Sequence, residues 1–371
     1  MRSFTPSRLT LARKRRGMTK KALAEAVGVS DRILTEYEAG RKQPTSATLI
    51  LLAEELKFPQ AFFSRPDADE FPLGAASFRA LSTVTSRQRD QATAAGELAF
   101  SLADWIDDRF ENLPKPDIPR LRGIDPETAA EFVRREWGLG ERSIRNVIHL
   151  LEARGVRVFS LAEECAEVDA YSCWRKSSNL KQKAPFVFLN TMKSAEHSRM
   201  DAAHELGHLV LHWRHETPRG REVEMEANAF ASAFLMPQDS IKANAPRGGT
   251  LNQMIAAKRL WGVSVAALVY RMHKLGLLTD WQYRALYIEL GKKGYRKNEP
   301  NEIERETSQV LAKVFNALRV DGISKADVAR DLCLPVEELN KLVFGLVITG
   351  LEGEADAASL EIKGQPNLRL V

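Results

Sequence analysis

The sequence predicts a mainly α-helical protein of several domains, with an α+β domain in the middle of the chain. At 371 residues the chain exceeds the size of one ordinary hydrophobic core, so two or three domains are expected. Helical patterns dominate the first 65 residues and return after residue 298. Between these regions, three short apolar segments typical of strands precede a helix that contains the motif H-E-x-x-H.

The composition is typical of a soluble globular protein of the cytoplasm. Hydrophobic residues make up 44% of the chain and charged residues 28%. The three cysteines are odd in number and show no C-x-x-C spacing, so a disulfide scaffold is not expected. The sequence contains neither an apolar run of about 18 residues nor the apolar core of a secretory signal at its N-terminus. We therefore expect a cytoplasmic protein with no membrane partner.

The positive charge is concentrated at the N-terminus. Residues 1–65 contain 13 Lys and Arg against 6 Asp and Glu, a net charge of +7, whereas the whole chain has +5. The remaining residues therefore sum to −2. Basic character confined to one small region indicates a polyanionic partner for that region.

The N-terminal region has the pattern of a helix-turn-helix domain. Thr19 and Ser30 each precede a short helical segment, where their side chains would cap the first turn. Gly28 lies between the two segments and supplies a tight turn. The predicted helices span Arg8–Arg16, Lys20–Val27, Asp31–Glu38 and Ser46–Leu56.

This region, from Leu9 to about Phe63, resembles the Cro/CI-type repressor DNA-binding domain of the XRE family. The resemblance rests on Thr19, Leu23-Ala24, Val27-Gly28-Val29-Ser30, Tyr37-Glu38-Ala39-Gly40 and Pro44. It implies that the second motif helix lies in the major groove of DNA, and a homodimer is expected by analogy with repressors that read palindromes. The residues expected to face base edges are Asp31, Arg32, Thr35 and Glu36, and those expected near phosphates are Arg41, Lys42 and the cluster Arg13–Arg16.

Two features depart from that family. Lys20 stands where the family usually has Gln, and Asp31 and Glu36 add negative charge to the reading face. A protein-interaction module on the same scaffold is the alternative interpretation. Leu34 and Tyr37 are expected in the core of the domain and not at the bases.

Proline-containing segments divide the rest of the chain. The acidic segment from Pro66 to Pro72 is typical of a linker, and a long amphipathic helix is expected from about Ser86 to Phe110. Later elements are a helix after Asp125, a helix over Arg142–Arg154, strands at Val156–Phe159, Tyr171–Trp174 and Pro185–Leu189, and a helix from Leu260 to Leu278. The predicted division is a DNA-binding domain over 1–65, linker and long helix over 66–118, an α+β domain over 119–298, and a C-terminal helical domain over 299–371.

His204, Glu205 and His208 form the H-E-x-x-H motif. The two histidines are four residues apart, so they share one helical face and can bind one metal ion. Glu205 is placed to take a proton from a water molecule at that ion, which is the chemistry of a zinc-dependent hydrolase and most often of a peptidase. Gly207 costs a helix about 1 kcal/mol relative to Ala, so it indicates that another backbone packs closely there.

A third ligand is expected from another helix. Catalytic zinc usually has three protein ligands, and the residues after His208 lack the extended H-x-x-G-x-x-H form. In the acidic segment that follows, Glu224 and Asn228 are four residues apart, so Glu224 would bind the ion while Asn228 holds a ligand in place. Glu226 is the second choice of ligand. It lies about 200° around the helix from Glu224, so the two cannot both face the ion.

Together with Leu235-Met236-Pro237, these residues resemble the ImmA/IrrE family of metallopeptidase domains over roughly residues 120–240. The resemblance implies a gluzincin-like zinc site with two His ligands and one Glu ligand, and therefore Zn2+ as the cofactor. Manganese or iron could occupy the same ligands. Several members of the family cleave or relieve repressor proteins.

In the expected mechanism Glu205 passes the proton of the activated water to the leaving amine. A further donor would stabilise the oxyanion, and the candidates are Tyr171, Arg199, His212 and His215. His212 follows His208 by four residues on the same face. It is expected to be packed or exposed to solvent and is not assigned to the metal.

Residues 324–335 repeat the N-terminal helix-turn-helix pattern in a degenerate form. Ser324 corresponds to Thr19, and Cys333 stands at the position of Gly28. The helix expected over Val336–Val343 carries two glutamates against one lysine, so we favour packing against protein or dimerisation over contact with phosphate.

The combined patterns predict a DNA-binding regulator with a zinc-dependent peptidase domain that cleaves a repressor-type protein. The alternative is a transcription factor whose peptidase-like domain is a non-catalytic sensor or a partner-binding module. The intact set of His204, Glu205 and His208 favours the enzyme, because a sensor has no need of a general base.

Overall fold

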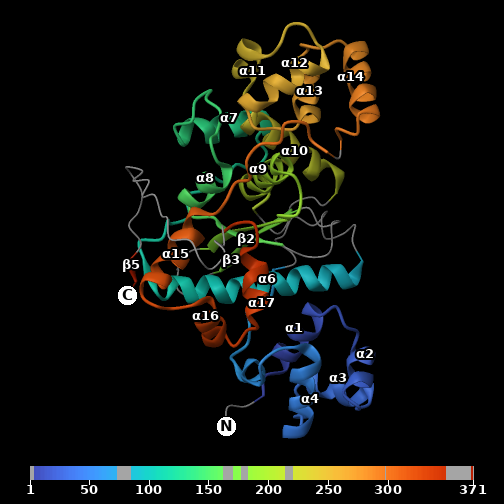
Figure 1. Ribbon diagram of the computed structural model, residues 1–371, viewed down its shortest axis with the longest axis vertical. Helices are drawn as coiled ribbons and strands as arrows, with labels where there is room; N and C mark the ends of the chain where they lie inside the picture. Colours follow the sequence, from blue (N-terminus) through green and yellow to red (C-terminus); the bar gives the residue numbers. More distant parts are fainter. Residues whose placement is uncertain are drawn as a thin grey trace.

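The computed structural model describes residues 4–72, 85–161, 170–176, 183–213, 220–296 and 298–347, and the backbone of Arg369–Leu370. The chain is mainly helical with one small sheet in its middle part, as the sequence predicts (Figure 1). Among the helices of these residues, none is both long enough and apolar enough to cross a membrane.

The N-terminal domain is all-helical. Its elements are α1 (Pro6–Arg15), α2 (Lys20–Ala26), α3 (Asp31–Glu38), α4 (Ser46–Leu56) and the short 3-10 helix η1 (Gln60–Ser64). Thr19 accepts a hydrogen bond from the Ala22 amide and Ser30 from the Ile33 amide, so both predicted caps are confirmed. Leu34 and Tyr37 are buried, which confirms their place in the core.

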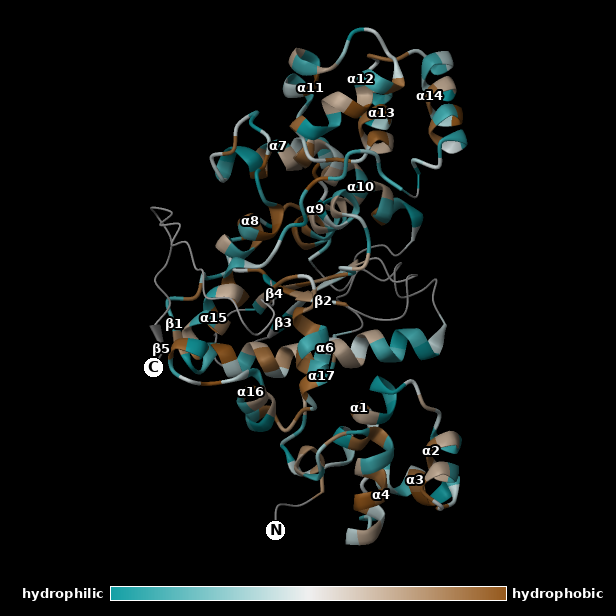
Figure 2. Cartoon of the chain, viewed as in Figure 1, coloured by the Kyte–Doolittle hydropathy of each residue, from teal (hydrophilic) through white to brown (hydrophobic). Residues whose placement is uncertain are grey.

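The long helix α6 (Ser86–Asp107) lies between the N-terminal domain and the sheet (Figure 1). Its polar first turns extend beyond the sheet, whereas its later, more hydrophobic part lies under it (Figure 2). The helix ends three residues earlier than expected. Phe110–Glu111 instead form strand β1, which pairs antiparallel with β5 (Arg369–Leu370).

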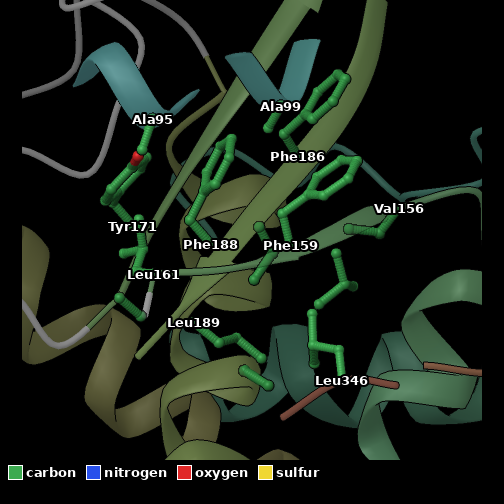
Figure 3. Close-up of a cluster of buried hydrophobic side chains, with 14 of the residues drawn as sticks. Ala95, Ala99, Val156, Phe159, Leu161, Tyr171, Phe186, Phe188, Leu189 and Leu346 are labelled. Atoms are coloured by element: carbon green, nitrogen blue, oxygen red, sulfur yellow. The ribbon is translucent and has the colours of Figure 1, made fainter. Parts of the chain in front are cut away.

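The sheet has the strand order β2-β4-β3. Strand β4 (Lys183–Leu189) is central, parallel to β2 (Arg157–Ser160) and antiparallel to β3 (Ala170–Lys176), so the three predicted strands are confirmed. Aromatic side chains cover the face of the sheet that packs on α6 (Figure 3). The residues are Phe159, Tyr171, Phe186 and Phe188, which lie toward Ala95 and Ala99 of α6.

Helix α9 (Ala195–Leu211) packs against β3 and β4, and α10 (Arg221–Leu235) packs against α9. Two predicted helices begin later than expected, because the capping residues lie further along the chain. Asn146 caps α8 (Val147–Ala153) and Ser264 caps α13 (Val265–Lys274). The remaining helical elements of this region are α7 (Pro126–Glu136), α11 (Gln238–Asn244), α12 (Leu251–Ala257), η2 (Lys258–Leu260) and α14 (Asp280–Lys292).

The C-terminal unit consists of α15 (Gln309–Val320), α16 (Lys325–Leu332) and α17 (Val336–Val343). The turn between α16 and α17 reproduces that of the N-terminal domain, because Cys333 has φ +55° where Gly28 has φ +69°. Left-handed backbone is natural for glycine and costs other residues about 1–2 kcal/mol. The repeat predicted from the sequence is therefore present in the backbone.

The face of α17 packs within the chain. Glu338 is buried and forms ion pairs with Arg15, at 2.6 Å, and with Arg16 at the end of α1. The expectation of protein packing for this helix is thus confirmed.

The same contacts correct the interpretation of the cluster Arg13–Arg16. Arg13 is paired with Glu38 at 2.6 Å, and Arg15 and Arg16 are paired with Glu338. These three arginines are engaged in internal ion pairs, and the fourth residue, Lys14, lies 3.8 Å from Asp90 of α6, so the cluster is not a free phosphate-binding surface. The sequence pattern could not reveal this, because the partner of Arg15 lies 323 residues away.

Candidate metal centre

Helix α9 carries the H-E-x-x-H motif in its second half. Ser194 caps its N-terminus by accepting from the His197 amide, so the helix begins well before the motif. His204 and His208 project from the same face, and their Nε2 atoms lie 3.0 Å apart. The His208 side chain is buried, whereas that of His204 is partly exposed. Two imidazole nitrogens of one helix therefore face a common point that solvent can reach past His204.

Gly207 allows α10 to approach this part of α9. A Cβ atom at residue 207 would lie 3.1 Å from the Phe230 ring and 3.3 Å from the Ala227 backbone. Ordinary carbon contacts are about 3.5–4.0 Å, so any larger residue would push the two helices apart. The close packing predicted from this glycine is confirmed, and α10 is the element concerned.

The close approach brings Glu224 of α10 to the two histidines. Its carboxylate oxygens lie 3.4 Å from His204 Nε2 and 3.6 Å from His208 Nε2. All three potential ligand atoms are within 4.8 Å of one another. Ligands about 2.0–2.1 Å from a tetrahedral ion lie about 3.3 Å apart, which is close to the distances from His204 to Glu224 Oε2, from His208 to Glu224 Oε1 and between the two imidazoles. The donor set therefore fits a zinc ion.

Asn228 and Glu226 occupy different positions on α10. Asn228 Oδ1 lies 3.0 Å from His204 Nδ1, on the side of the imidazole opposite to Glu224. Glu226 lies 2.8 Å from His212 Nε2 and takes no part in the group of three. The structure thus brings Glu224 to the histidine pair and places Glu226 beside His212, the C-cap residue of α9.

The two motif histidines differ in electrostatic environment. Burial, together with the neighbouring His204 and His212, lowers the pKa of His208 well below its usual value. Burial would also lower the pKa of His204, but the carboxylates of Glu224, Glu205 and Asp201 outweigh this effect and raise it. A neutral imidazole is the form that binds a metal ion, so His208 is held in that form.

Glu205 is 2% exposed and lies beside an acidic neighbour that the sequence reasoning did not identify. Asp201 precedes Glu205 by one helical turn, and burial raises its pKa to about 7. Its Oδ2 atom is buried without a hydrogen-bond partner. The i, i+4 spacing from Glu205 was the available signal, because such residues are neighbours on one helical face.

Three of the candidates for oxyanion stabilisation are engaged elsewhere. The Tyr171 hydroxyl donates to the Ala92 carbonyl of α6 at 2.6 Å, on the far face of the sheet. The Arg199 guanidinium is buried against Glu306 and the Ile144 carbonyl. His212 contacts His208 and Glu226. His215 lies outside the described residues.

The expected DNA-reading residues lie on and just after α3. Asp31 and Arg32 are exposed at its N-terminus, whereas Thr35 and Glu36 are half-buried. The Arg41 guanidinium donates to Glu36 at 2.8 Å, and this hydrogen bond lowers the pKa of Glu36. Lys42 is exposed beside them. Arg41, which is expected to contact phosphate, is therefore paired with a carboxylate in the free protein.

Two families match parts of this chain. Residues 9–59 match the helix-turn-helix family, and residues 151–273 match a peptidase family described as the IrrE N-terminal-like domain. No curated protein matches the chain. The chain therefore combines a helix-turn-helix domain of the DNA-binding type with an α+β domain of the metallopeptidase type.

Proposed function

We propose that this protein is a cytoplasmic DNA-binding regulator whose middle domain is a zinc-dependent peptidase that cleaves a repressor-type protein. The observation that carries the proposal is the convergence of His204, His208 and Glu224 at distances that suit one tetrahedral ion. The match of residues 151–273 to a peptidase family supports the same interpretation. We assign the DNA-binding domain to residues 1–65, the linker and long helix to 66–118, the peptidase domain to 119–298 and the C-terminal domain to 299–371.

In this proposal His204, His208 and Glu224 hold the ion, and Asn228 orients His204. Zinc, when bound, would act as a Lewis acid toward water and the scissile carbonyl. Glu205 would accept the proton of the attacking water and deliver it to the leaving amine. The position of Glu205 next to His204 in the motif supports both roles.

DNA binding is assigned to α3 and the segment after it. The exposed Arg32, Arg41 and Lys42 provide positive charge there, and Thr35 provides a hydroxyl for the base edges. We propose that two copies of the chain bind a palindromic site, as paired helix-turn-helix domains do.

Metal content of the purified protein tests the site first. The wild type is expected to contain one zinc per chain, Glu224→Gln to lose it and Glu205→Gln to retain it. Absence of zinc from the wild type, or zinc retained in Glu224→Gln, would contradict the ligand set.

Catalysis is tested separately, in cells that produce either the wild type or Glu205→Gln. Mapping of new protein N-termini is expected to find a cleaved repressor-type protein with the wild type alone. If both forms act equally on transcription and neither generates new N-termini, the domain is a sensor or partner-binding module. A sensor or partner-binding module is the second candidate function. The comparison of the wild type with Glu205→Gln distinguishes it from the peptidase.

A further inference from the structure

A chain of polar contacts leads from His208 to the surface of α10. His208 Nδ1 lies 3.0 Å from His212 Nδ1, and His212 Nε2 lies 2.8 Å from Glu226 Oε2. His212 is the C-cap residue directly after α9, and its side chain is 8% exposed. Glu226 is 43% exposed, so its carboxylate lies at the edge of the protein.

The proton positions along this chain follow from the geometry. His208 directs Nε2 toward His204 and Glu224, so the lone pair on Nε2 is available for a metal ion and the proton of a neutral ring is on Nδ1. That N–H donates to His212 Nδ1, which must accept. The proton of a neutral His212 is then on Nε2, from which it donates to the carboxylate of Glu226. An ionised carboxylate can only accept, so it sets the direction of both hydrogen bonds.

The other ligand histidine is oriented by a simpler partner. His204 directs Nε2 toward Glu224, and its Nδ1 donates to the amide oxygen of Asn228. The two rings are thus held by hydrogen bonds of the same kind at Nδ1. In one case the acceptor is a neutral amide, and in the other it is an imidazole backed by a negative charge.

We propose that His212 and Glu226 are positioning residues that fix the tautomer and ring orientation of His208 for metal binding. The inference rests on the proposed metallopeptidase function and adds two residues that bind neither metal nor substrate. Partners of this kind raise the basicity of the ligand imidazole, and their loss typically weakens metal affinity about 10–100-fold. Glu226 therefore acts on the ion through two imidazoles, although it is not a ligand.

The test is the zinc affinity of the full-length chain, measured by competition with a chelator. Glu226→Gln and His212→Phe are expected to bind zinc about 10-fold or more weakly, within the range for such partners. His212→Asn is expected to recover part of the loss, because its amide oxygen can accept from His208 Nδ1. The matched control is Glu222→Gln, an exposed residue of the same helix, which should bind as the wild type does.

The visible spectrum of the cobalt-substituted protein separates positioning from ligation. The variants are expected to keep the coordination number of the wild type, with weaker binding. Equal zinc affinity in the wild type, Glu226→Gln and His212→Phe would overturn this inference alone, and so would a spectrum that shows a lost ligand in His212→Phe. A wild type that binds no zinc would overturn the proposed function and, with it, this inference.

Discussion

At the scale of single residues, Gly207 controls the distance between the two helices that carry the proposed metal ligands. The histidines belong to α9 and Glu224 to α10, so their geometry depends on how closely the helices pack. Over-packing at such a contact costs about 1–3 kcal/mol, whereas alanine in place of glycine stabilises a helix by about 1 kcal/mol. The two effects offset each other in part and leave a net loss of up to about 2 kcal/mol, while Glu224 is displaced from the histidines.

We therefore expect Gly207→Ala to lower zinc affinity and to lower the free energy of unfolding by at most about 2 kcal/mol. The control is Gly291→Ala in α14, where an added Cβ meets no atom within 4 Å. That substitution should stabilise the protein by up to about 1 kcal/mol and leave zinc affinity unchanged. An unaltered zinc affinity in Gly207→Ala would show that the site tolerates movement of α10.

Cys333 gives a second prediction for a single residue. It adopts the left-handed backbone conformation that Gly28 adopts at the corresponding position of the N-terminal domain. Cys333→Gly should stabilise the C-terminal unit by up to about 1 kcal/mol, since the relief of strain exceeds the added chain entropy. Thermal unfolding measures the effect. Cys333→Ala retains a Cβ and should bring no gain, so equal behaviour of the two variants would contradict the strain argument.

At the scale of elements, α3 and the segment after it carry both basic residues, which would attract DNA phosphates, and acidic residues, which would repel them. Glu36 pairs with Arg41 in the free protein, so that arginine must leave its partner to reach a phosphate. Glu36→Gln is expected to strengthen binding of duplex DNA at low salt. Lys42→Ala is expected to weaken it and to reduce the slope of log affinity against log salt by about 1. Titrations of one duplex at several salt concentrations measure both, and a slope unaffected by Lys42→Ala would place that lysine away from the phosphates.

The helices and strands were largely predictable from the sequence, because caps and turns are local. Thr19, Ser30 and the glycine between them define α2 and α3 without reference to the rest of the chain. The proposed ligands His204 and His208 share one helix, so their spacing was sufficient to place them together. The contact of Glu226 with His212 was not predictable in the same way, because it depends on how α10 turns against α9. The contacts of Tyr171 with α6 and of Arg199 with Glu306 were not predictable either, because they depend on how distant parts of the chain pack together.

At the scale of the whole molecule, the C-terminal unit connects the other two domains. Glu152 of α8 accepts from the backbone amides of Gln309 and Val310 at the start of α15, which joins this unit to the α+β domain. On its other side, Glu338 joins α17 to α1 of the N-terminal domain. Each connection is made by a buried carboxylate, that of Glu152 on one side and that of Glu338 on the other.

The connection through Glu338 should depend on pH. Burial would raise the pKa of Glu338, but Arg15 and Arg16 together hold it below the usual value of 4.5. A carboxyl whose pKa is lower in the folded state stabilises the fold above its unfolded pKa, and this stability is lost as pH falls through the folded value. We expect Glu338→Gln to destabilise the protein by about 3–5 kcal/mol near neutral pH, because two arginines lose their buried partner.

The difference between wild type and Glu338→Gln should therefore be largest at neutral pH and shrink below about pH 4. It can be measured at the first thermal transition, since a protein of several domains need not unfold in one step. Limited proteolysis in the segment 66–72 gives an independent reading of a loosened N-terminal domain. A difference that stays constant with pH would show that the charge of Glu338 is not what holds the domains together.

The buried bridge between α17 and α1 also limits how the protein can be re-engineered. If a different helix-turn-helix domain replaced residues 1–65, Glu338 would face the residues at the C-terminal end of the first helix of that domain. Unless two arginines stand there, the chimera would bury a lone carboxylate and lose its fixed docking geometry. New DNA specificity is therefore better introduced by exchanging the exposed residues of α3 than by exchanging the domain.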